Sequence, residues 1–466
     1  MSELPQGWAT VTVGAIVDLD PKSTCDDSTE VGFIPMSLMG THVRARPNFE
    51  ARRWSEVKKG YTHFADGDVL LARITPCFEN GKSGIPRGLP SGLGAGSTEY
   101  VVLRPVPKVL VPEILLAALS TDAFRRNGEM AMTGAVGQQR VPKQYVLGYQ
   151  VKLPPFAEQH RIAHKLDAVL ARIDSCRERL DRVPAILKRF REAVLEAAVS
   201  GRLTEEWRES HGLSLDSWSR ATVGTLLTRI EAGLNVQCDE RPPQPTEQGL
   251  IKISAVTWGK FDEEESKTLP KGREVPESTR VTRGDFLMSR ANTLELVGAC
   301  VIVDKVTMPV YLSDKVWRLV VDDQVKPWLL ISLRSRAGRR QIEELASGNQ
   351  LSMRNLSQAN LKTIELSLPP QDERLEIVRR VDELFTLADQ LETKYRAAVE
   401  RVEQLTPAVL AKAFRGELVP QDPEDEPASV LLERTRVQRA GRSTTVETEQ
   451  VRSRFAKQAR GKKVGR

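Results

Sequence analysis

The chain has 466 residues, of which 40% are hydrophobic and 28% charged, and its formal net charge is +6. No apolar run approaches the length of a membrane span and no signal peptide starts the sequence, so a membrane protein is excluded and a cytoplasmic location is expected. The cysteines lie far apart without a C-x-x-C pair, which is typical of reduced thiols rather than of a disulfide framework: Cys25, Cys77, Cys176, Cys238 and Cys300.

The positive charge is concentrated at the end of the sequence. Residues 436–466 hold ten Lys/Arg and two Glu, a net charge of +8, which leaves −2 for residues 1–435. Net charge alone therefore does not mark the body of the chain as a nucleic-acid binder. Residues 421–466 are predicted to be a basic, disordered tail, either solvated or adding non-specific attraction to phosphates.

Residues 1–152 are predicted to form a first domain. Short apolar alternations such as "YVVLRP" lie between turns rich in Gly and Pro, and this pattern indicates a mostly-β domain of the α+β class. The stretch "GLGAGS" (92–97) loosely resembles a nucleotide-binding turn. Because Pro86 and Pro90 interrupt any preceding strand, we interpret it as a plain loop.

The segment "LPPFAEQHRIAHKLD", which begins at Leu153, invites two chemical readings that both fail. Amino-methyltransferases place Asp, Asn or Ser before the two prolines to accept from the substrate amine, and Leu153 accepts nothing. His160 and His164 share a helix face, but zinc needs three or four ligands. Arg161 also stands where a zinc protease carries its base. No catalytic or metal site is predicted here.

The same segment recurs at Leu368 as "LPPQDERLEIVRRVD", and the shift of 215 residues holds without a gap over 51 positions. A long internal repeat is strong evidence of architecture. The identical pairs include Glu158 and Glu373, Ile162 and Ile377, Asp167 and Asp382, Asp174 and Asp389, Ala198 and Ala413, and Gly201 and Gly416.

Both copies, residues 153–203 and 368–420, are predicted to be long helices with a heptad seam, the pattern of a coiled coil. Pro184 and Pro407 lie inside them and should kink or divide the helices. The simplest partner of each helix is the other one; the alternative is two unrelated helices docked on separate domains. The seams are Ile162, Leu166, Val169, Ile173, Cys176, Leu180, Val183, Leu187, Phe190 and Val194, and Ile377, Val381, Leu384, Ala388, Leu391, Tyr395, Ala398, Val402, Leu405 and Val409.

Residues 204–367 are predicted to form a second domain that repeats the first more faintly. The stretch "DGDVLLAR" (66–73) matches "RGDFLMSR" (283–290), and "STEYVVL" (97–103) resembles "SDKVWRL" (313–319). Trp8 likewise matches Trp218. The chain is therefore predicted to be domain, long helix, domain, long helix, followed by the tail.

This organisation resembles the specificity subunit of Type I restriction-modification systems. The resemblance runs from "LPQGWATVTVGAI" through "LSLPPQDERLEIVRRVDELF" to "AKAFRGELVP" and covers nearly the whole chain. It implies two mostly-β target recognition domains in tandem, with the two helices forming an antiparallel coiled coil of pseudo-twofold symmetry. Pro184 and the sequence beyond Gln421 depart from the family pattern.

What the resemblance implies about function is specific. Such a subunit is not an enzyme; each domain reads one half of a bipartite double-stranded DNA target, and the helices hold the domains apart and dock methyltransferase subunits, expected to number two. Restriction subunits join where they are present. S-adenosylmethionine, ATP and Mg are expected on those partner subunits, and no cofactor on this chain.

Base-reading residues are expected among the Arg, Asn, Gln and Thr side chains near the repeated landmarks, because these groups match base edges in the major groove. The basic run that begins at Arg44 and continues to Lys59 suits phosphates better than bases. The candidates for DNA binding are Arg44, Arg46, Arg73, Thr75, Gln138, Gln139, Arg140 and Lys143 in the first domain, and Arg290, Asn292, Thr293, Asn349, Gln350, Arg354 and Asn355 in the second.

Two other function classes stay open at the level of sequence. One is a coiled-coil scaffold that joins two protein-binding domains without recognising DNA. The polar loops at matching places in both halves argue against it. The other is a self-contained restriction-modification enzyme, which would need a cofactor motif and a catalytic tetrad, and neither is found in the sequence.

Overall fold

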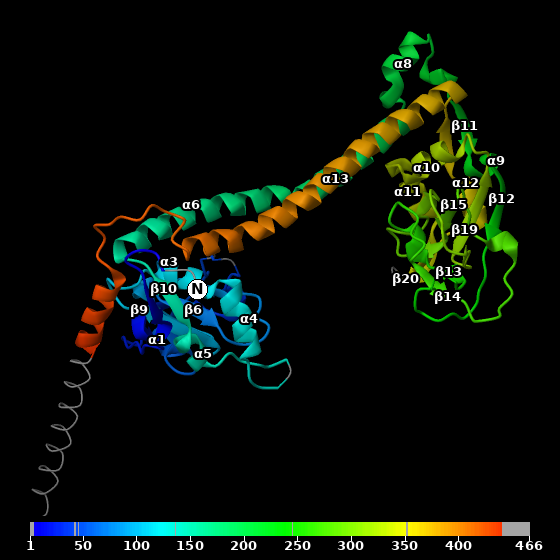
Figure 1. Cartoon of the computed structure of the whole chain (residues 1–466). Helices are drawn as coiled ribbons and strands as arrows, with labels where there is room; N and C mark the ends of the chain where they lie inside the picture. Colours follow the sequence, from blue (N-terminus) through cyan, green and yellow to red (C-terminus); the bar gives the residue numbers. More distant parts are fainter. Residues whose placement is uncertain are drawn as a thin grey trace, which may run out of the picture. The chain divides into compact units, whose positions relative to one another are not determined.

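The computed structural model describes residues 4–41, 43–44, 46–135, 137–244, 246–350 and 353–439. The chain forms two compact units, unit 1 with Met1–Leu180 and Ala397–Arg466, and unit 2 with Asp181–Arg396. Each unit combines one predicted domain with parts of both predicted long helices (Figure 1).

Unit 1 is built on two four-stranded sheets and a two-stranded one, in the orders β2-β9-β6-β7, β4-β3-β8-β5 and β1-β10. Its strands are β1 (Ala9–Thr12), β2 (Val17–Leu19), β3 (Glu30–Ile34), β4 (Glu50–Arg53), β5 (Thr62–Ala65), β6 (Val69–Ala72), β7 (Ser83–Gly84), β8 (Leu93–Gly96), β9 (Tyr100–Pro105) and β10 (Gln150–Leu153). Its helices are α1 (Val13–Ile16), α2 (Trp54–Val57), α3 (Pro112–Leu119), α4 (Asp122–Met130), α5 (Lys143–Gly148) and α6 (Phe156–Leu180).

Unit 2 repeats this plan, with the sheets β12-β19-β15-β17, β14-β13-β18, β16-β21-β20 and β11-β22. Its strands are β11 (Ser219–Thr222), β12 (Leu227–Ala232), β13 (Gly249–Ile251), β14 (Ser266–Thr268), β15 (Phe286–Ser289), β16 (Ala291–Asn292), β17 (Cys300–Ile302), β18 (Val310–Tyr311), β19 (Val316–Val321), β20 (Ser347–Gln350), β21 (Met353–Asn355) and β22 (Glu365–Leu368). Its helices are α7 (Val183–Val199), α8 (Glu205–Ser210), α9 (Val223–Leu226), α10 (Lys326–Arg334), α11 (Arg336–Leu345), α12 (Gln358–Thr363) and the first part of α13 (Gln371–Ala413).

The two units share their central pairings. The parallel pair β3–β8 of unit 1 corresponds to β13–β18 of unit 2, and both are flanked by an antiparallel strand, β4 and β14. In each unit one antiparallel pair, β1–β10 or β11–β22, joins the start and the end of the predicted domain. The predicted tandem of related α+β domains is therefore confirmed, with the repeat extending to strand order.

In unit 1, α6 packs antiparallel to the last part of α13. Buried Ile162, Leu166 and Ile173 of α6 share a core with Leu410 and Ala413 of α13. The side chain of Arg177, near the end of α6, donates from Nη2 to Thr406 Oγ1 at 3.1 Å. Figure 1 shows α6 alongside this part of α13, next to the strands of unit 1.

In unit 2, α7 packs antiparallel to the first part of α13. Arg191 Nη2 donates to Asp389 Oδ1 at 2.9 Å, whereas just beyond the end of α7 the carbonyl of Leu203 accepts from Arg380 Nη1 at 2.7 Å, so the two chain directions oppose each other. The predicted antiparallel pairing of the repeated helices is thus confirmed within each unit. The predicted seam is not buried throughout, because Leu391 and Leu405 are each 43% exposed.

The two prolines inside the helices behave differently. The first helix is divided at Pro184: α6 ends at Leu180 and α7 begins at Val183, so that Pro184 stands in the first turn of α7, where its missing N–H leaves no hydrogen bond unmade. The second helix, α13, continues through Pro407. The prediction that the prolines kink or divide their helices is confirmed at Pro184, where the helix divides, whereas α13 is not divided at Pro407.

The segment after α13 differs from the predicted disordered tail. Residues 428–439 are helical, Ala428 is fully buried and its N–H donates to Gly7 O at 2.8 Å. The guanidinium of Arg439 donates to the carbonyls of Ala15 and Val17 at 2.9 and 3.0 Å, next to the end of α1. Residues 421–439 therefore belong to the packed part of unit 1. The expectation of disorder for residues 440–466 lies outside the described residues.

A hydrogen bond between a tryptophan and a glutamate stands at the start of each long helix. The indole Nε1 of Trp8 donates to Glu158 Oε2 at 2.9 Å, and that of Trp218 donates to Glu373 Oε2 at 2.8 Å. Glu158 is 1% exposed, and among the described residues its Oε1 has no hydrogen-bond partner. Burial raises the pKa of Glu158, against the hydrogen bond from Trp8, which lowers it.

Glu158→Gln is expected to flatten the pH dependence of the stability of unit 1. Because the pKa of Glu158 is raised in the folded state, its contribution to stability is fully present below the ordinary glutamate pKa and is lost as pH rises through the raised pKa. A glutamine cannot ionise, so the variant should match the wild type at pH 4 and exceed its melting temperature at pH 8. Thermal unfolding at a series of pH values measures this, and equal pH profiles would contradict it.

Candidate nucleic-acid interface

The small sheet β16-β21-β20 brings most of the candidate residues of unit 2 together. Ala291 pairs with Asn355, and Asn292 pairs with Arg354. β20 and β21 form a hairpin in which Ser347 also pairs with Asn355. In Figure 1, β20 lies near β13 and β14, at the end of unit 2 away from β11. Residues that are more than sixty positions apart in sequence thus share one edge of the unit.

A loop with the same backbone frame gathers the candidates of unit 1. Arg140 pairs with both Ile74 and Thr133, and Thr75 N–H donates to Gln139 O at 3.0 Å. By register, Arg140 of unit 1 occupies the place of Asn355 in unit 2, and Gln139 that of Arg354. The structure thus brings the candidate Thr75 beside Gln139 and Arg140, and the candidate Asn292 beside Arg354.

A glycine turns the chain at the same position of each hairpin. Gly134 and Gly348 have φ values of +122° and +141°, which side chains with a Cβ rarely adopt. A Cβ on Gly348 would also stand 2.6 Å from Met353 O. The duplication of this strained position indicates that the hairpin itself, and not only the sheet beneath it, is part of the repeated fold.

The main chain of one arginine anchors each hairpin to the central sheet. In unit 1, Arg73 N–H donates to Glu99 O at 3.0 Å, and its carbonyl accepts from Val141 N–H at 2.8 Å. In unit 2, the main chain of Arg290 makes the same two hydrogen bonds, to Lys315 O and from Leu356 N–H, at 2.9 and 2.8 Å. The backbone of both arginines is therefore held from two sides.

Three of the candidate arginines form no ion pair with any of the described residues. The side chains of Arg73, Arg290 and Arg354 are partly buried, and the Nε atom of each is buried without a hydrogen-bond partner among the described residues. A buried Nε donor without a partner is costly, because it has given up its hydrogen bond to water. Arg73 and Arg290 occupy equivalent positions, so this cost is present in both units.

Three other candidates are committed to carboxylates. Arg140 holds Glu99 through both Nε and Nη2, with Nη2–Oε1 at 2.7 Å, and this contact raises the pKa of Arg140. Lys143 forms an ion pair with Asp20. Arg44 does not face outward with the hairpin but lies against α6, as described below. The sequence could not show these partners, because they are 41 to 130 residues away along the chain.

The remaining candidates are less defined. Thr75 Oγ1 donates to Glu79 Oε1 at 2.8 Å, and Asn292 Oδ1 accepts from Thr293 N–H at 2.8 Å. Gln138, Thr293 and Asn355 are exposed, as is Arg46 on its own loop. The side chains of Asn349 and Gln350 lie outside the described residues.

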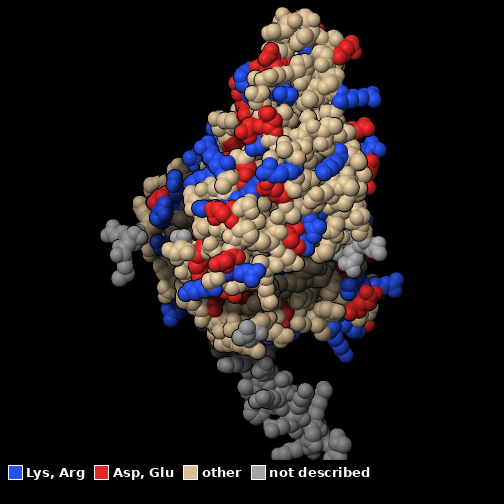
Figure 2. Space-filling model, turned by 90° about the vertical axis from the view of Figure 1, so that its right-hand side faces the viewer, with Lys and Arg blue, Asp and Glu red and all other residues tan. Residues whose placement is uncertain are grey.

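The two hairpins differ in charge, and the difference is visible in the repeat. When "STEYVVL" is matched with "SDKVWRL", Glu99 falls on Lys315. Unit 1 therefore has Glu99, paired with Arg140 of its hairpin, where unit 2 has Lys315, paired with its neighbour Asp314. Figure 2 shows Lys/Arg and Asp/Glu side chains interspersed on the face it presents.

Neither a metal centre nor a membrane segment is found in the described part of the chain. No group of three or more His, Cys, Asp or Glu side chains there could hold a metal ion. The His160 ring packs edge-on against Phe156, with the ring centroids 4.8 Å apart. Among the same residues, no helix combines the length and the apolar character that crossing a membrane requires.

Comparison with known proteins identifies relatives over nearly the whole chain. A family model described as "Type I restriction modification DNA specificity domain" matches residues 5–185. The chain is 32% identical to the Type I restriction enzyme EcoKI specificity subunit of Escherichia coli (strain K12), over 94% of this chain and 97% of that protein. It is 29% identical to the EcoEI specificity subunit of Escherichia coli, over 88% and 83%.

Solved structures show the same fold at low sequence identity. A chain from "Structural basis underlying complex assembly and conformational transition of the type I R-M system" superposes with a TM-score of 0.66 at 20% identity, over 90% of this chain and all of that one. The HsdS subunit from Thermoanaerobacter tengcongensis gives a TM-score of 0.56 at 19% identity, over 89% and 98%. With the full-length relatives and the duplicated helices, these findings place the chain in the family of Type I restriction enzyme specificity subunits.

Proposed function

We propose that this chain is the DNA sequence-recognition subunit of a Type I restriction-modification complex, and that each unit reads one half of a bipartite target. Members of this family are specificity subunits rather than the catalytic subunits of such complexes. The observation that carries the proposal is the duplicated hairpin with its arginine anchors. Arg73 and Arg290 present guanidinium groups that no described carboxylate neutralises, and guanidinium is the group that best matches the guanine edge.

The paired helices are proposed to set the spacing of the two half-sites and to dock two methyltransferase subunits. S-adenosylmethionine would bind to those subunits, and ATP and Mg to restriction subunits, so that this chain holds no cofactor. The antiparallel pairing within each unit and the duplication of the helix starts support a partner that binds twice. A scaffold without a role in DNA recognition is not favoured, because the relatives are specificity subunits over nearly their full length.

Arg290→Ala and Arg354→Ala are each expected to weaken binding to the target by about 1–3 kcal/mol, the value of one bidentate base contact. Specificity should relax at one base pair of one half-site only. The measurement is binding of the methyltransferase complex to duplexes that carry each single base change, at one fixed salt concentration. The matched control is Arg340→Ala, because Arg340 is 79% exposed at its side chain and is paired on its own helix with Glu344.

The salt dependence of binding separates base contacts from phosphate contacts. A phosphate contact at Arg290 or Arg354 would lower the affinity for every sequence evenly and reduce the salt slope by about one. Unchanged affinity in both variants would overturn the assignment of the hairpin, whereas absence of any sequence preference in the wild-type complex would overturn the proposed function itself.

A further inference from the structure

A second duplicated set of residues lies on the long helices, away from the hairpins. In unit 1, Arg44 donates from Nε to Asp167 Oδ1 at 2.7 Å and from Nη1 to Asp174 Oδ2 at 3.1 Å. In unit 2, Lys260 donates from Nζ to Asp389 Oδ2 at 2.8 Å. Asp174 and Asp389 are equivalent in the 215-residue repeat, and the two cations come from corresponding loops, Arg44 between β3 and β4 and Lys260 between β13 and β14.

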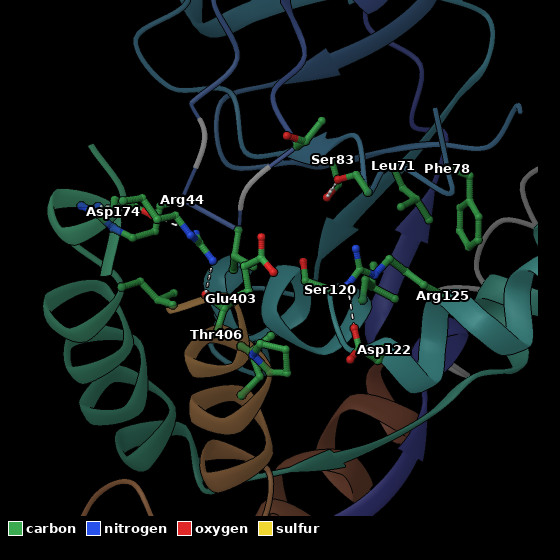
Figure 3. Close-up of a pocket in the computed structure, with 18 residues that line it drawn as sticks. Arg44, Leu71, Phe78, Ser83, Ser120, Asp122, Arg125, Asp174, Glu403 and Thr406 are labelled. Carbon is green, nitrogen blue, oxygen red and sulfur yellow. Dashed lines mark hydrogen bonds and ion pairs between the residues drawn. The ribbon is translucent and has the colours of Figure 1, made fainter. Parts of the chain in front are cut away.

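Each of these aspartates is also tied to the opposite helix by an arginine. Arg177 lies 3.4 Å from Asp174 Oδ1 and donates to Thr406 Oγ1 on α13 at 3.1 Å. Figure 3 shows Arg44 reaching Asp174 on α6, with Thr406 of α13 close by. We call this set, Arg44, Asp174, Arg177 and Thr406, the unit 1 junction.

The unit 2 junction consists of Lys260, Asp389, Arg191 and Glu392. Arg191 Nη2 donates to Asp389 Oδ1 at 2.9 Å and to Glu392 Oε2 at 2.8 Å. In the repeat, Arg177 corresponds to Glu392 and Thr406 to Arg191. The arginine therefore stands on the same helix as the aspartate in unit 1 and on the opposite helix in unit 2, but in both units it links the aspartate to the paired helix. Lys260, then Arg191, lowers the pKa of Asp389.

Each junction lies far along the helix from the point where its domain is attached to the helix start. Asp174 and Asp389 each stand 18 residues after the first residue of α6 and α13, which is about 27 Å at ~1.5 Å per residue. Each domain is attached at the helix start by the strand pair β1–β10 or β11–β22, and apolar side chains further along the helix share a core with the domain. In unit 2, where these apolar contacts end at Phe385, the contact of Lys260 with Asp389 opposes a swing of the domain along its helix.

We propose that the junctions are positioning contacts that fix the orientation of each DNA-reading domain on its helix, and thereby the spacing of half-sites that the subunit accepts. The inference rests on the proposed function. Arg44, which is expected from the sequence to bind DNA, is in this proposal a contact that holds the domain to α6. Exposed ion pairs are individually weak, so the expected effect is a relaxed spacing rather than loss of binding.

The two junctions should differ in importance. In unit 1, the buried residues that α6 shares with the domain core extend to Leu170 and Ile173, next to Asp174. In unit 2, the cluster that joins the domain to α13 ends at Phe385, before Asp389. Lys260 is thus the more isolated distal contact among the described residues. Asp389→Asn should relax spacing more than Asp174→Asn.

The test uses the complete methyltransferase complex and duplexes that carry the mapped target with its natural spacer or with one base pair added or removed. Asp389→Asn is expected to reduce the preference for the natural spacer about two- to five-fold, the scale of one exposed ion pair. The base preference within each half-site should stay unchanged. Asp389→Glu keeps a carboxylate within reach of Lys260 and should restore the preference, which a purely structural defect would not allow.

Asp425→Asn is the matched control, because Asp425 pairs with Arg161 of α6 but belongs to the segment after α13 and not to the reading domain. An unchanged spacer preference in Asp389→Asn, or equal relaxation by Asp425→Asn, would overturn the inference. Altered base preference within a half-site would also overturn it, since the junction would then act on reading itself. Loss of all sequence preference in the wild-type complex would instead refute the proposed function.

Discussion

Glu373→Gln is expected to destabilise unit 2 by about 3–5 kcal/mol, because it leaves a buried guanidinium without its counter-ion. Glu373 is fully buried, and its Oε1 accepts from Thr204 Oγ1 at 2.8 Å and pairs with Arg208, whose side chain is 6% exposed. Trp218 occupies the other carboxylate oxygen. Glutamine can keep the hydrogen bond from Trp218, but it offers an N–H toward Arg208 where a negative charge stood.

Urea unfolding of the full chain, with hydrogen exchange read from peptides of unit 2, measures the loss. Glu376→Gln is the control, because Glu376 lies one turn further on α13 and pairs only with Arg379 and Arg380 of the same helix. Arg379, whose side chain is 54% exposed, lowers the pKa of Glu376 to about 2, and such exposed pairs contribute about 0.3–0.5 kcal/mol. Equal stabilities of the two variants would contradict the assignment of a buried ion pair.

Glu158 and Glu373 make a matched pair with opposite expectations. They are identical residues 215 positions apart, and each accepts from a tryptophan. In unit 2 the chain continues from α7 through Thr204 and Arg208, which reach Glu373. The position that corresponds to Arg208 after α13 is Pro423, which cannot supply a charge. Removal of the carboxylate should therefore raise the stability of unit 1 at high pH and lower the stability of unit 2.

The helices and the repeat could be predicted from the sequence because they depend on local spacing. Heptad periodicity and the 215-residue shift predicted α6, α7 and α13, and the kinship of the two domains followed from matched landmarks such as "DGDVLLAR". The same landmarks selected Thr75, Arg140, Asn292 and Arg354 as candidates, and the structure brings Thr75 near Arg140 and Asn292 near Arg354. These relations survive because equivalent loops in related domains return to the same edge of the sheet.

The charge partners could not be predicted, because they depend on distant pairing. Arg44 looked like a phosphate ligand within a basic run, but its carboxylate partners stand on α6, 123 and 130 residues away. Arg140 looked like a base reader, but Glu99 occupies its guanidinium. The segment 421–439 looked like the start of a disordered tail, because its packing depends on a few contacts such as Ala428 with Gly7. In all three cases the contacts come from residues that lie far away along the chain.

A methyltransferase complex is expected to methylate a target made of two copies of one half-site when its specificity chain carries residues 13–149 also in place of residues 223–364. The boundaries follow from the strand pairs that close each domain: Val13 N–H donates to Tyr149 O at 3.0 Å, and Val223 N–H donates to Ile364 O at 2.9 Å. Everything that gathers at the hairpin of unit 1 lies between residues 13 and 149. If the hairpins read sequence, the second half-site should be replaced completely rather than weakened.

The transplanted domain should pack well, because the helix surface it meets is repeated. In unit 1 the domain core contacts Ile162, Leu410 and Ala413, and the equivalent positions of unit 2 hold Ile377, Leu195 and Ala198. One buried contact needs repair. Gln159, fully buried, accepts from Val111 N–H and donates to Val109 O, both at 2.9 Å, whereas its equivalent in α13 is Arg374. The transplant should therefore carry Arg374→Gln.

Methylation-sensitive sequencing of a host that expresses this chain with the methyltransferase subunits reads out the target. The control is Arg374→Gln in the natural chain, which should keep the original two-part sequence. Persistence of the original second half-site in the transplant would mean that residues 223–364 do not carry its recognition. A new, unrelated second half-site would mean that the helix beneath the domain, and not the domain alone, selects the bases. Two copies of the first half-site would locate recognition within residues 13–149, as the duplicated hairpin predicts.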